Sequence, residues 1–244
     1  MTDVASMIGW YGKTPSTGDF VSRRLARPTI NEVDRWCEVG MLALRERAPD
    51  TWERSYASAP TWNALVPARV IAPHACLVSV AASSDRVGRR FPFCVVAAPP
   101  PATLASIASL GEYGEAMATL IEQSTRASIG VDEFDARLSA LAARYFDGPA
   151  TASDDDSDIG AVLGELAIDA ADLVTVPLGA HAAFPWPDLA RTFEPEGATS
   201  YWWSHRQSMP SPGGFTHRGT LTPALFVMLF GERAAEARTR EAAR

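Results

Sequence analysis

Apolar residues gather in short blocks along this chain, and several of the blocks have the length of a β-strand. Residues 7–12 form an aromatic run, and residues 75–82 and 91–98 form two β-rich runs. Residues 199–205 hold a similar run, and residues 62–71 another that Pro67 interrupts. Short apolar runs bounded by turn residues are typical of strands, so we predict a strand in each.

The runs at 75–82 and 91–98 are separated by a polar loop, residues 83–90, that contains Gly88. This arrangement predicts a β-hairpin. The loop is unusually charged, because it holds Asp85, Arg86, Arg89 and Arg90 within six residues. A carboxylate there can fix a guanidinium through charge-assisted hydrogen bonds. The loop could therefore bind a phosphate or an acidic peptide, or its charges could form an internal network that braces it.

Other segments show the apolar spacing of helices. A capping box, Thr29 to Glu32, is followed by apolar residues at helical spacing up to Ala48, where Pro49 would end the helix. Thr222 as N-cap and Pro223 at the first helical position predict a last helix over 225–237. Apolar spacing predicts further helices at 104–121, 131–145 and 159–173. The segments predicted to be irregular are 13–19, 52–62, 151–158, 174–187 and 210–219. The end of the chain, residues 238–244, is predicted to fray.

These elements predict an α/β fold with a mostly antiparallel central sheet covered by helices. The prolines at 99–101 end a sheet segment sharply, because proline cannot donate to a strand ladder. We expect residues 1–100 to form a sheet-rich region. Residues 101–244 would form a helical region with a returning strand and a C-terminal helix, packed as one domain with the first.

Composition narrows the class of protein. The chain has 244 residues, 47% of them hydrophobic and 21% charged, as in ordinary globular proteins. A net charge of −7 argues against general binding to nucleic acid or anionic membranes. Its three cysteines have no CxxC spacing, and no apolar stretch reaches the ~18 residues of a membrane span. We therefore expect a cytoplasmic protein with reduced thiols and no membrane insertion.

No motif supplies a catalytic centre, a metal site or a cofactor site. Gly12-Lys13-Thr14 lacks the upstream glycine of a phosphate-binding loop, since Met7 stands at that position. Lys13 is the only lysine, which either marks function or reflects codon drift. Asp154, Asp156, Asp158 and Glu165 have calcium-loop spacing, but Ile159 replaces the required glycine, so an acidic surface loop is the better interpretation. The four histidines lack metal-ligand spacing, and no Gly-x-Ser-x-Gly motif is present.

Trp202 and Trp203 would point to opposite faces of a strand. We expect one of them to fill the core and the other to be exposed as an interface anchor.

Taken together, the motifs resemble the TagF family of type VI secretion-associated proteins. The resemblance rests on Gly-Trp-Tyr-Gly-Lys-Thr-Pro at 9–15, the segment 18–25, Trp36, the Pro-x-Trp segment at 59–62 and Ser-Asp-Arg-Val-Gly-Arg-Arg-Phe-Pro-Phe at 84–93. It is weaker at 200–203 and 221–230, and the middle of the chain, residues 102–195, has no matching motif. Residues 82–83 depart from the family pattern, where a proline-serine pair is expected.

This resemblance implies a non-catalytic, post-translational repressor of type VI secretion. It would act by binding a scaffold or assembly component of that apparatus, in some bacteria the forkhead-associated scaffold protein. The alternative is a sensor or enzyme that binds a phosphate ligand or a nucleotide in the same basic loops. If the loops at 13–19 and 83–90 meet in space, the candidate partner-binding residues are Lys13, Asp19, Arg23, Asp85, Arg86, Arg89 and Trp202.

Overall fold

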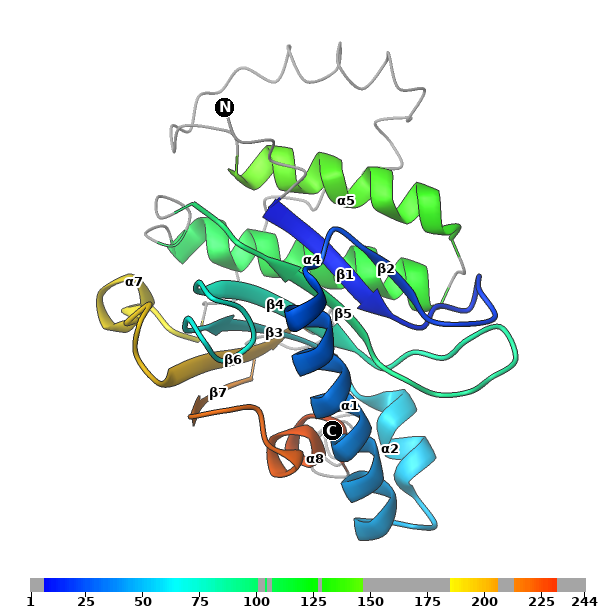
Figure 1. Cartoon of the computed structure of the whole chain (residues 1–244). Coiled ribbons are helices and arrows are strands. Elements are labelled where there is room, and N and C mark those ends of the chain that lie inside the picture. The colour runs from blue at the N-terminus through cyan, green and yellow to red at the C-terminus, as the bar shows by residue number, and fades with distance from the viewer. Residues whose placement is uncertain are drawn as a thin grey trace, which may run out of the picture.

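Seven strands form one sheet in the order β2-β1-β5-β4-β3-β6-β7, and each neighbouring pair is antiparallel. Figure 1 shows this computed structural model, in which helices lie on both sides of the sheet. It describes residues 7–100, 104, 107–126, 129–146, 185–205 and 213–231. The predicted α/β fold, a mostly antiparallel sheet covered by helices, is confirmed.

The apolar runs fold as the strands predicted from them. The hairpin is confirmed, since β5 pairs along its full length with β4, with Leu77 opposite Ala97 and Ala81 opposite Phe93. The run interrupted by Pro67 becomes a strand that ends one residue before the proline. The predicted strands are β1 (Ile8–Gly12), β3 (Thr61–Val66), β4 (Cys76–Ala81), β5 (Phe93–Ala97) and β6 (Thr199–His205).

Two edge strands were not predicted. The strand β2 (Val21–Arg23) has only three residues and pairs with β1. The strand β7 (Gly214–Arg218) lies in a segment predicted as loop, so that prediction is wrong. Both strands lie at sheet edges and are partly exposed. The two edge strands contain polar residues and so lack the apolar pattern of a strand. They form because their backbones pair with the neighbouring strands β1 and β6.

The first long helix, α1 (Arg27–Arg47), ends where Pro49 predicted, but it begins earlier than expected. Its N-cap is Ala26, which makes no side-chain cap, so the predicted capping box at Thr29 is wrong. Pro28 explains the shift: it lacks a backbone N–H and fits the first helical turn, where no partner is needed. Thr29 is therefore inside the helix and buried.

The remaining helices match the predictions unevenly. Thr222 caps α8 (Pro223–Phe230) as predicted, because its hydroxyl accepts from the backbone N–H of Leu225 at 3.1 Å. The helices α4 (Ile107–Arg126) and α5 (Val131–Phe146) are confirmed, and α7 (Leu189–Thr192) is a single short turn. The passage predicted as irregular contains α2 (Trp52–Ser58), which buries Tyr56. That passage was predicted wrongly.

The two faces of the sheet carry separate cores. One core packs Trp62, Ala64 and the Trp202 ring against α1, α2 and α8. The other packs Leu65, Leu77 and the Trp203 ring against α4, α5 and α7. Trp202 and Trp203 therefore do point to opposite faces, but both are buried, at 0% and 2% exposure. The expectation that one of them is exposed is wrong, because helices cover both faces.

The strands of this sheet come from both halves of the chain. β6 and β7 follow the proline run by about a hundred residues, yet β6 pairs with β3 from Thr61 to Leu65. The acidic run at 151–158, Glu165, the predicted helix 159–173, His181 and the end at 232–244 lie outside the described residues.

Candidate functional site

Two loops that are far apart in sequence lie against each other at one end of the sheet, at the right of Figure 1. One loop follows β1 and the other joins β4 to β5, and β1 pairs with β5 so that Gly12 faces Phe93. The backbone N–H of Arg86 donates to the Thr17 carbonyl at 2.7 Å, and the Arg89 guanidinium donates to the Gly18 carbonyl at 2.6 Å. We call residues 13–20 and 83–90 the loop junction.

Gly12 permits the close approach of the two segments that lead into these loops. Its φ is +141°, and a Cβ added there would lie 2.2 Å from the Pro92 carbonyl oxygen. Only glycine has both this backbone freedom and the missing side chain. The first loop therefore leaves β1 at the point where the second loop enters β5.

Asp85 lies at the centre of the loop junction, and its side chain is fully buried. Its Oδ2 accepts from Lys13 Nζ at 3.0 Å and from Arg89 Nε at 2.7 Å. Its Oδ1 accepts from the backbone N–H groups of Val87 at 3.1 Å and Arg89 at 2.9 Å. One carboxylate thus fixes the second loop's backbone and ties it to the first loop.

The electrostatics of Asp85 follow from these contacts. Desolvation by burial raises the pKa of its carboxyl group, while the Arg89 backbone N–H and the Lys13 and Arg89 side chains lower it. The lowering contacts outweigh burial, so the pKa lies well below its ordinary value. Asp85 is therefore ionised at neutral pH and holds its partners in place.

The charges of the loop junction divide into two groups. Lys13 and Asp85 are buried and paired with each other, so they brace the loops and are not accessible to a partner. Arg89 belongs to both groups, since it contacts Asp85 and Gly18 while 60% of its side chain is exposed. Asp19 and Arg86 are exposed, and no ion pair involves Arg86 in the described part of the chain.

Two apolar side chains add to the exposed part of the loop junction. Phe20 is 42% exposed and Val87 is 70% exposed. The Phe20 ring stacks on Tyr11 and meets Phe91 edge-on at 4.7 Å, and Lys13 Nζ lies 4.9 Å from its centroid. Phe20 is therefore a fixed aromatic side chain, although no candidate list from the sequence includes it. The signal available in the sequence was its place in the segment 18–25, which resembles the family motif.

Arg23 and Trp202 are not part of this surface. Arg23 lies on β2 and pairs with Asp132 of α5 at 3.3 Å, where both side chains are exposed. Its neighbour Arg24 bonds to Asp135 of the same helix at 2.6 Å, and Asp135 also accepts from Trp10 Nε1. These contacts attach α5 to the sheet. Trp202 lies in the core beside Trp36 and Phe215.

The described residues hold no cluster of three or more His, Cys, Asp or Glu side chains that could bind a metal ion. None of the helices that the structure describes is long and apolar enough to cross a membrane.

Comparison with known sequences gives the family. The model of the TagF N-terminal domain, Type VI secretion system-associated, matches residues 9–141, which is more than half of the chain. The chain therefore belongs to this family of type VI secretion-associated proteins, and the resemblance seen in its motifs is confirmed. The matched region contains the whole loop junction. No curated protein sequence matches the chain.

Comparison with solved structures supports the fold. The crystal structure of PA0076 from Pseudomonas aeruginosa PAO1 superposes with a TM-score of 0.61. The two sequences are 22% identical, and the alignment covers 92% of this chain and 94% of that one. At this identity the similarity concerns the fold alone.

Proposed function

We propose that this TagF-family chain is a non-catalytic, post-translational repressor of type VI secretion. It acts by binding a scaffold or assembly component of the secretion apparatus, with the forkhead-associated scaffold protein as the first candidate. The family assignment supports the link to type VI secretion. The loop junction supports a role in binding.

One observation carries the proposal: the loop junction presents exposed side chains on a fixed backbone. Arg86, Phe20 and Val87 are exposed, while the loops beneath them are fixed by the buried Lys13–Asp85 pair. A surface that is ordered before it binds loses little conformational entropy on association. Arginine and aromatic side chains are also the residues that most often dominate binding energy at interfaces.

The alternative, a phosphate or nucleotide ligand in these loops, has less support. The cations that would bind it are mostly occupied, since Lys13 and Arg89 both contact Asp85. Arg86 is exposed, but Asp19 is exposed in the adjoining loop and would oppose an anion. An exposed arginine beside apolar side chains suits a protein partner better than a small anion.

The proposal is tested by reversing one exposed charge. Arg86→Glu should reduce recovery of a type VI secretion component at least tenfold when the tagged chain is purified from its native host with the secretion cluster intact. It should also relieve repression, measured as secretion substrates released into the medium. Arg54→Glu is the matched control, because Arg54 is an exposed arginine on α2, outside the loop junction. Full binding and repression by a folded Arg86→Glu variant would reject this surface.

A further inference from the structure

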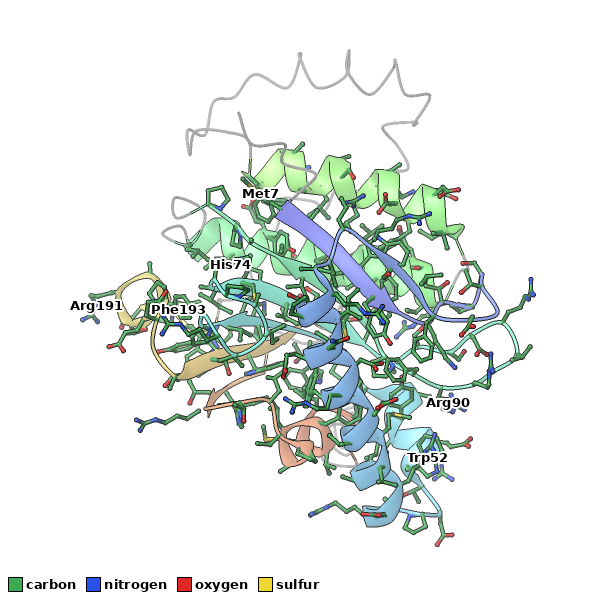
Figure 2. All side chains as sticks on the ribbon, in the orientation of Figure 1. Met7, Trp52, His74, Arg90, Arg191 and Phe193 are labelled. Atoms are coloured by element: carbon green, nitrogen blue, oxygen red, sulfur yellow. The ribbon has the colours of Figure 1, made fainter. Side chains whose placement is uncertain are left out.

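The strand β7 forms one edge of the sheet, and no strand that the structure describes pairs with its outer side. Figure 1 shows β7 at the margin of the sheet, next to β6. The neighbouring segment α7 contacts β6, since the ring of Phe193, directly after α7 and labelled in Figure 2, lies 6.2 Å from the Tyr201 ring. The outer edge of β7 is therefore a strand edge without a described strand beside it.

The hydrogen bonds at the two ends of β7 show which of its backbone groups face β6. The Ser204 N–H donates to the Gly213 carbonyl at 2.9 Å, and the Gly219 N–H donates to the Ala198 carbonyl at 2.8 Å. In an antiparallel pair, residues that bond to the partner strand alternate with residues whose N–H and C=O groups point away from it. Every second residue from Gly213 to Gly219 therefore bonds to β6.

The residues between them direct their backbone groups to the open edge. They are Gly214, Thr216 and Arg218, and all three are exposed. Each has one N–H donor and one C=O acceptor on the main chain. These groups have the spacing that a further antiparallel strand needs.

The edge of β7 also lacks most features that usually prevent such pairing. Edge strands are commonly very short, or they carry lysine, proline or a bulge. The opposite edge follows this rule, because β2 has only three residues and ends at Arg23, with Arg24 next. By contrast, β7 has five residues, contains neither proline nor lysine, and keeps one unbroken register with β6. Its arginine, Arg218, stands at its last position.

We propose that this edge pairs with the same edge of a second copy of the chain, so that the two sheets join in a dimer. In the antiparallel register centred on Thr216, each Thr216 pairs with the other, and Gly214 of either copy pairs with Arg218 of its counterpart. All outward groups of β7 are then bonded. A shift of two residues in either direction leaves one of the three residues without a partner inside the strand.

The side chains suit this register. Two threonines opposite each other form a favourable cross-strand pair. Arg218 stands opposite a glycine, so the two arginines do not oppose each other. On the other face of the strand, Phe215 stands opposite His217 of the second copy, and pairing covers these two partly exposed side chains further. Such a contact is isologous, because both copies use the same residues.

The dimer leaves both loop junctions free, because β3 and β6 separate β7 from the strands that carry them. Two copies joined in this way present two loop junctions, which strengthens binding to a partner that has more than one matching site. The pairing itself does not depend on what the loop junction binds.

The first test is analytical ultracentrifugation of the full chain over a range of concentrations. We expect a monomer–dimer equilibrium, because the contact is small and small interfaces are weak. Thr216→Pro removes an N–H that does not bond to β6, and Thr216→Lys places two like charges opposite each other. Each should weaken the dimer at least tenfold. The matched control Thr216→Val keeps the N–H, and it should change the dissociation constant less than about threefold.

The second test is cross-linking by oxidised glutathione, and it checks the register. Thr216→Cys should form a disulfide-linked dimer, because the two Cα atoms at this position lie about 5.5 Å apart in the proposed pairing, within the ~4.4–6.8 Å that a disulfide spans. Arg218→Cys should not, because four residues along the strand separate the two positions by about 14 Å. The three natural cysteines are buried and are the same in both variants.

A chain that stays monomeric at every concentration overturns the proposal. So does a dimer that Thr216→Lys leaves unchanged in a chain that unfolds cooperatively, because another surface then holds it. If the chain is monomeric and Thr216→Pro abolishes recovery of a secretion component from the native host, the edge binds a strand of another protein, and self-pairing is rejected. If Thr216→Pro does not fold, Thr216→Lys and the two cysteine variants still decide the question.

Discussion

Asp85 and Arg86 are adjacent in sequence but have opposite roles. Asp85 accepts four hydrogen bonds inside the loop junction, so its carboxylate has little capacity left for a partner. The Arg86 side chain is exposed, while its backbone N–H is held by the Thr17 carbonyl. A buried charge that is fully hydrogen-bonded positions the chain around it, whereas an exposed charge can contact another molecule.

The role of Asp85 predicts a pH dependence of stability. Its pKa in the folded chain lies below the ordinary value of about 3.9, so the unfolded state binds the proton more readily. Its contribution to stability is therefore fully present above about pH 4 and is lost as the pH falls towards the folded-state pKa. In urea unfolding, Asp85→Asn should be less stable than the native chain at pH 7 and at pH 5, with the difference shrinking below pH 4.

Asp19→Asn is the control for that experiment, because Asp19 is exposed and its Oδ1 accepts from the neighbouring Phe20 N–H at 2.8 Å, outside the buried network of Asp85. Its unfolding free energy should stay within about 0.5 kcal/mol of the native value at each pH. A difference between Asp85→Asn and the native chain that disappears between pH 7 and pH 5 would contradict the assigned role.

At the scale of single residues, the sequence showed which loop concentrates charged side chains but not which of those side chains are buried. Four charged residues in one loop left two interpretations open, a binding surface or an internal network. The internal network is confirmed for Asp85, which is buried and paired with Lys13, whereas the binding surface stays a prediction that the exposed Arg86 allows. The deciding contact, Lys13 Nζ to Asp85, joins residues 72 positions apart. It depends on the pairing of β1 with β5, which no local pattern encodes.

Among the elements, α1 and α8 pack closely because α1 carries a glycine at their contact. A Cβ added at Gly40 would lie 2.2 Å from Cγ of Phe226. Phe226 is fully buried between the Trp36 and Phe230 rings, so it has little room to move. Glycine normally weakens a helix, and here the close packing of a second helix offsets that loss.

Gly40→Ala should therefore destabilise the chain although alanine favours helices. Overpacking a core costs about 1–3 kcal/mol, and the gain in helix propensity of up to about 1 kcal/mol recovers only part of it. We expect a net loss of about 1–2 kcal/mol in the free energy of unfolding, measured by urea denaturation. Gly130→Ala is the control, because nothing lies within 4 Å of a Cβ added there, and it should change stability by less than about 0.5 kcal/mol. Equal effects of the two substitutions would mean that Gly40 is not a packing requirement.

The elements that the sequence predicted are those with a strong apolar pattern of their own. The helix α5 buries Phe134 and Leu138 four residues apart, and its spacing alone identifies it. The helix α2 has one apolar pair at this spacing, Trp52 and Tyr56, of which Tyr56 is buried. A single pair does not distinguish a helix from irregular chain. The strand β7 is partly exposed and depends on β6, so its own residues carry no strand signal.

For the whole molecule, β3 is the strand that joins the two halves of the chain. Trp62 and Asn63 are adjacent in β3 and so point to opposite faces. Trp62 Nε1 donates to the Leu229 carbonyl of α8 at 2.9 Å. Asn63 Nδ2 donates to the Gly114 carbonyl of α4 at 3.1 Å. Both helices follow the proline run at 99–101, as does β6, which pairs with β3 along its edge.

This arrangement predicts that residues 1–100 do not fold alone. Without the later elements, β3 loses its neighbour β6, and side chains such as Leu65, Leu77 and Val95 lose the cover of α4 and α5. Exposing one large apolar side chain costs about 1.5–3 kcal/mol, so a few of them exceed the 5–15 kcal/mol that typically stabilises a domain. The fragment should show no cooperative thermal transition, and its amide proton NMR signals should have narrow chemical-shift dispersion. The full chain should show a cooperative transition. A dispersed spectrum and a cooperative transition in the fragment would instead make the first hundred residues a domain of their own, with the proline run as its boundary.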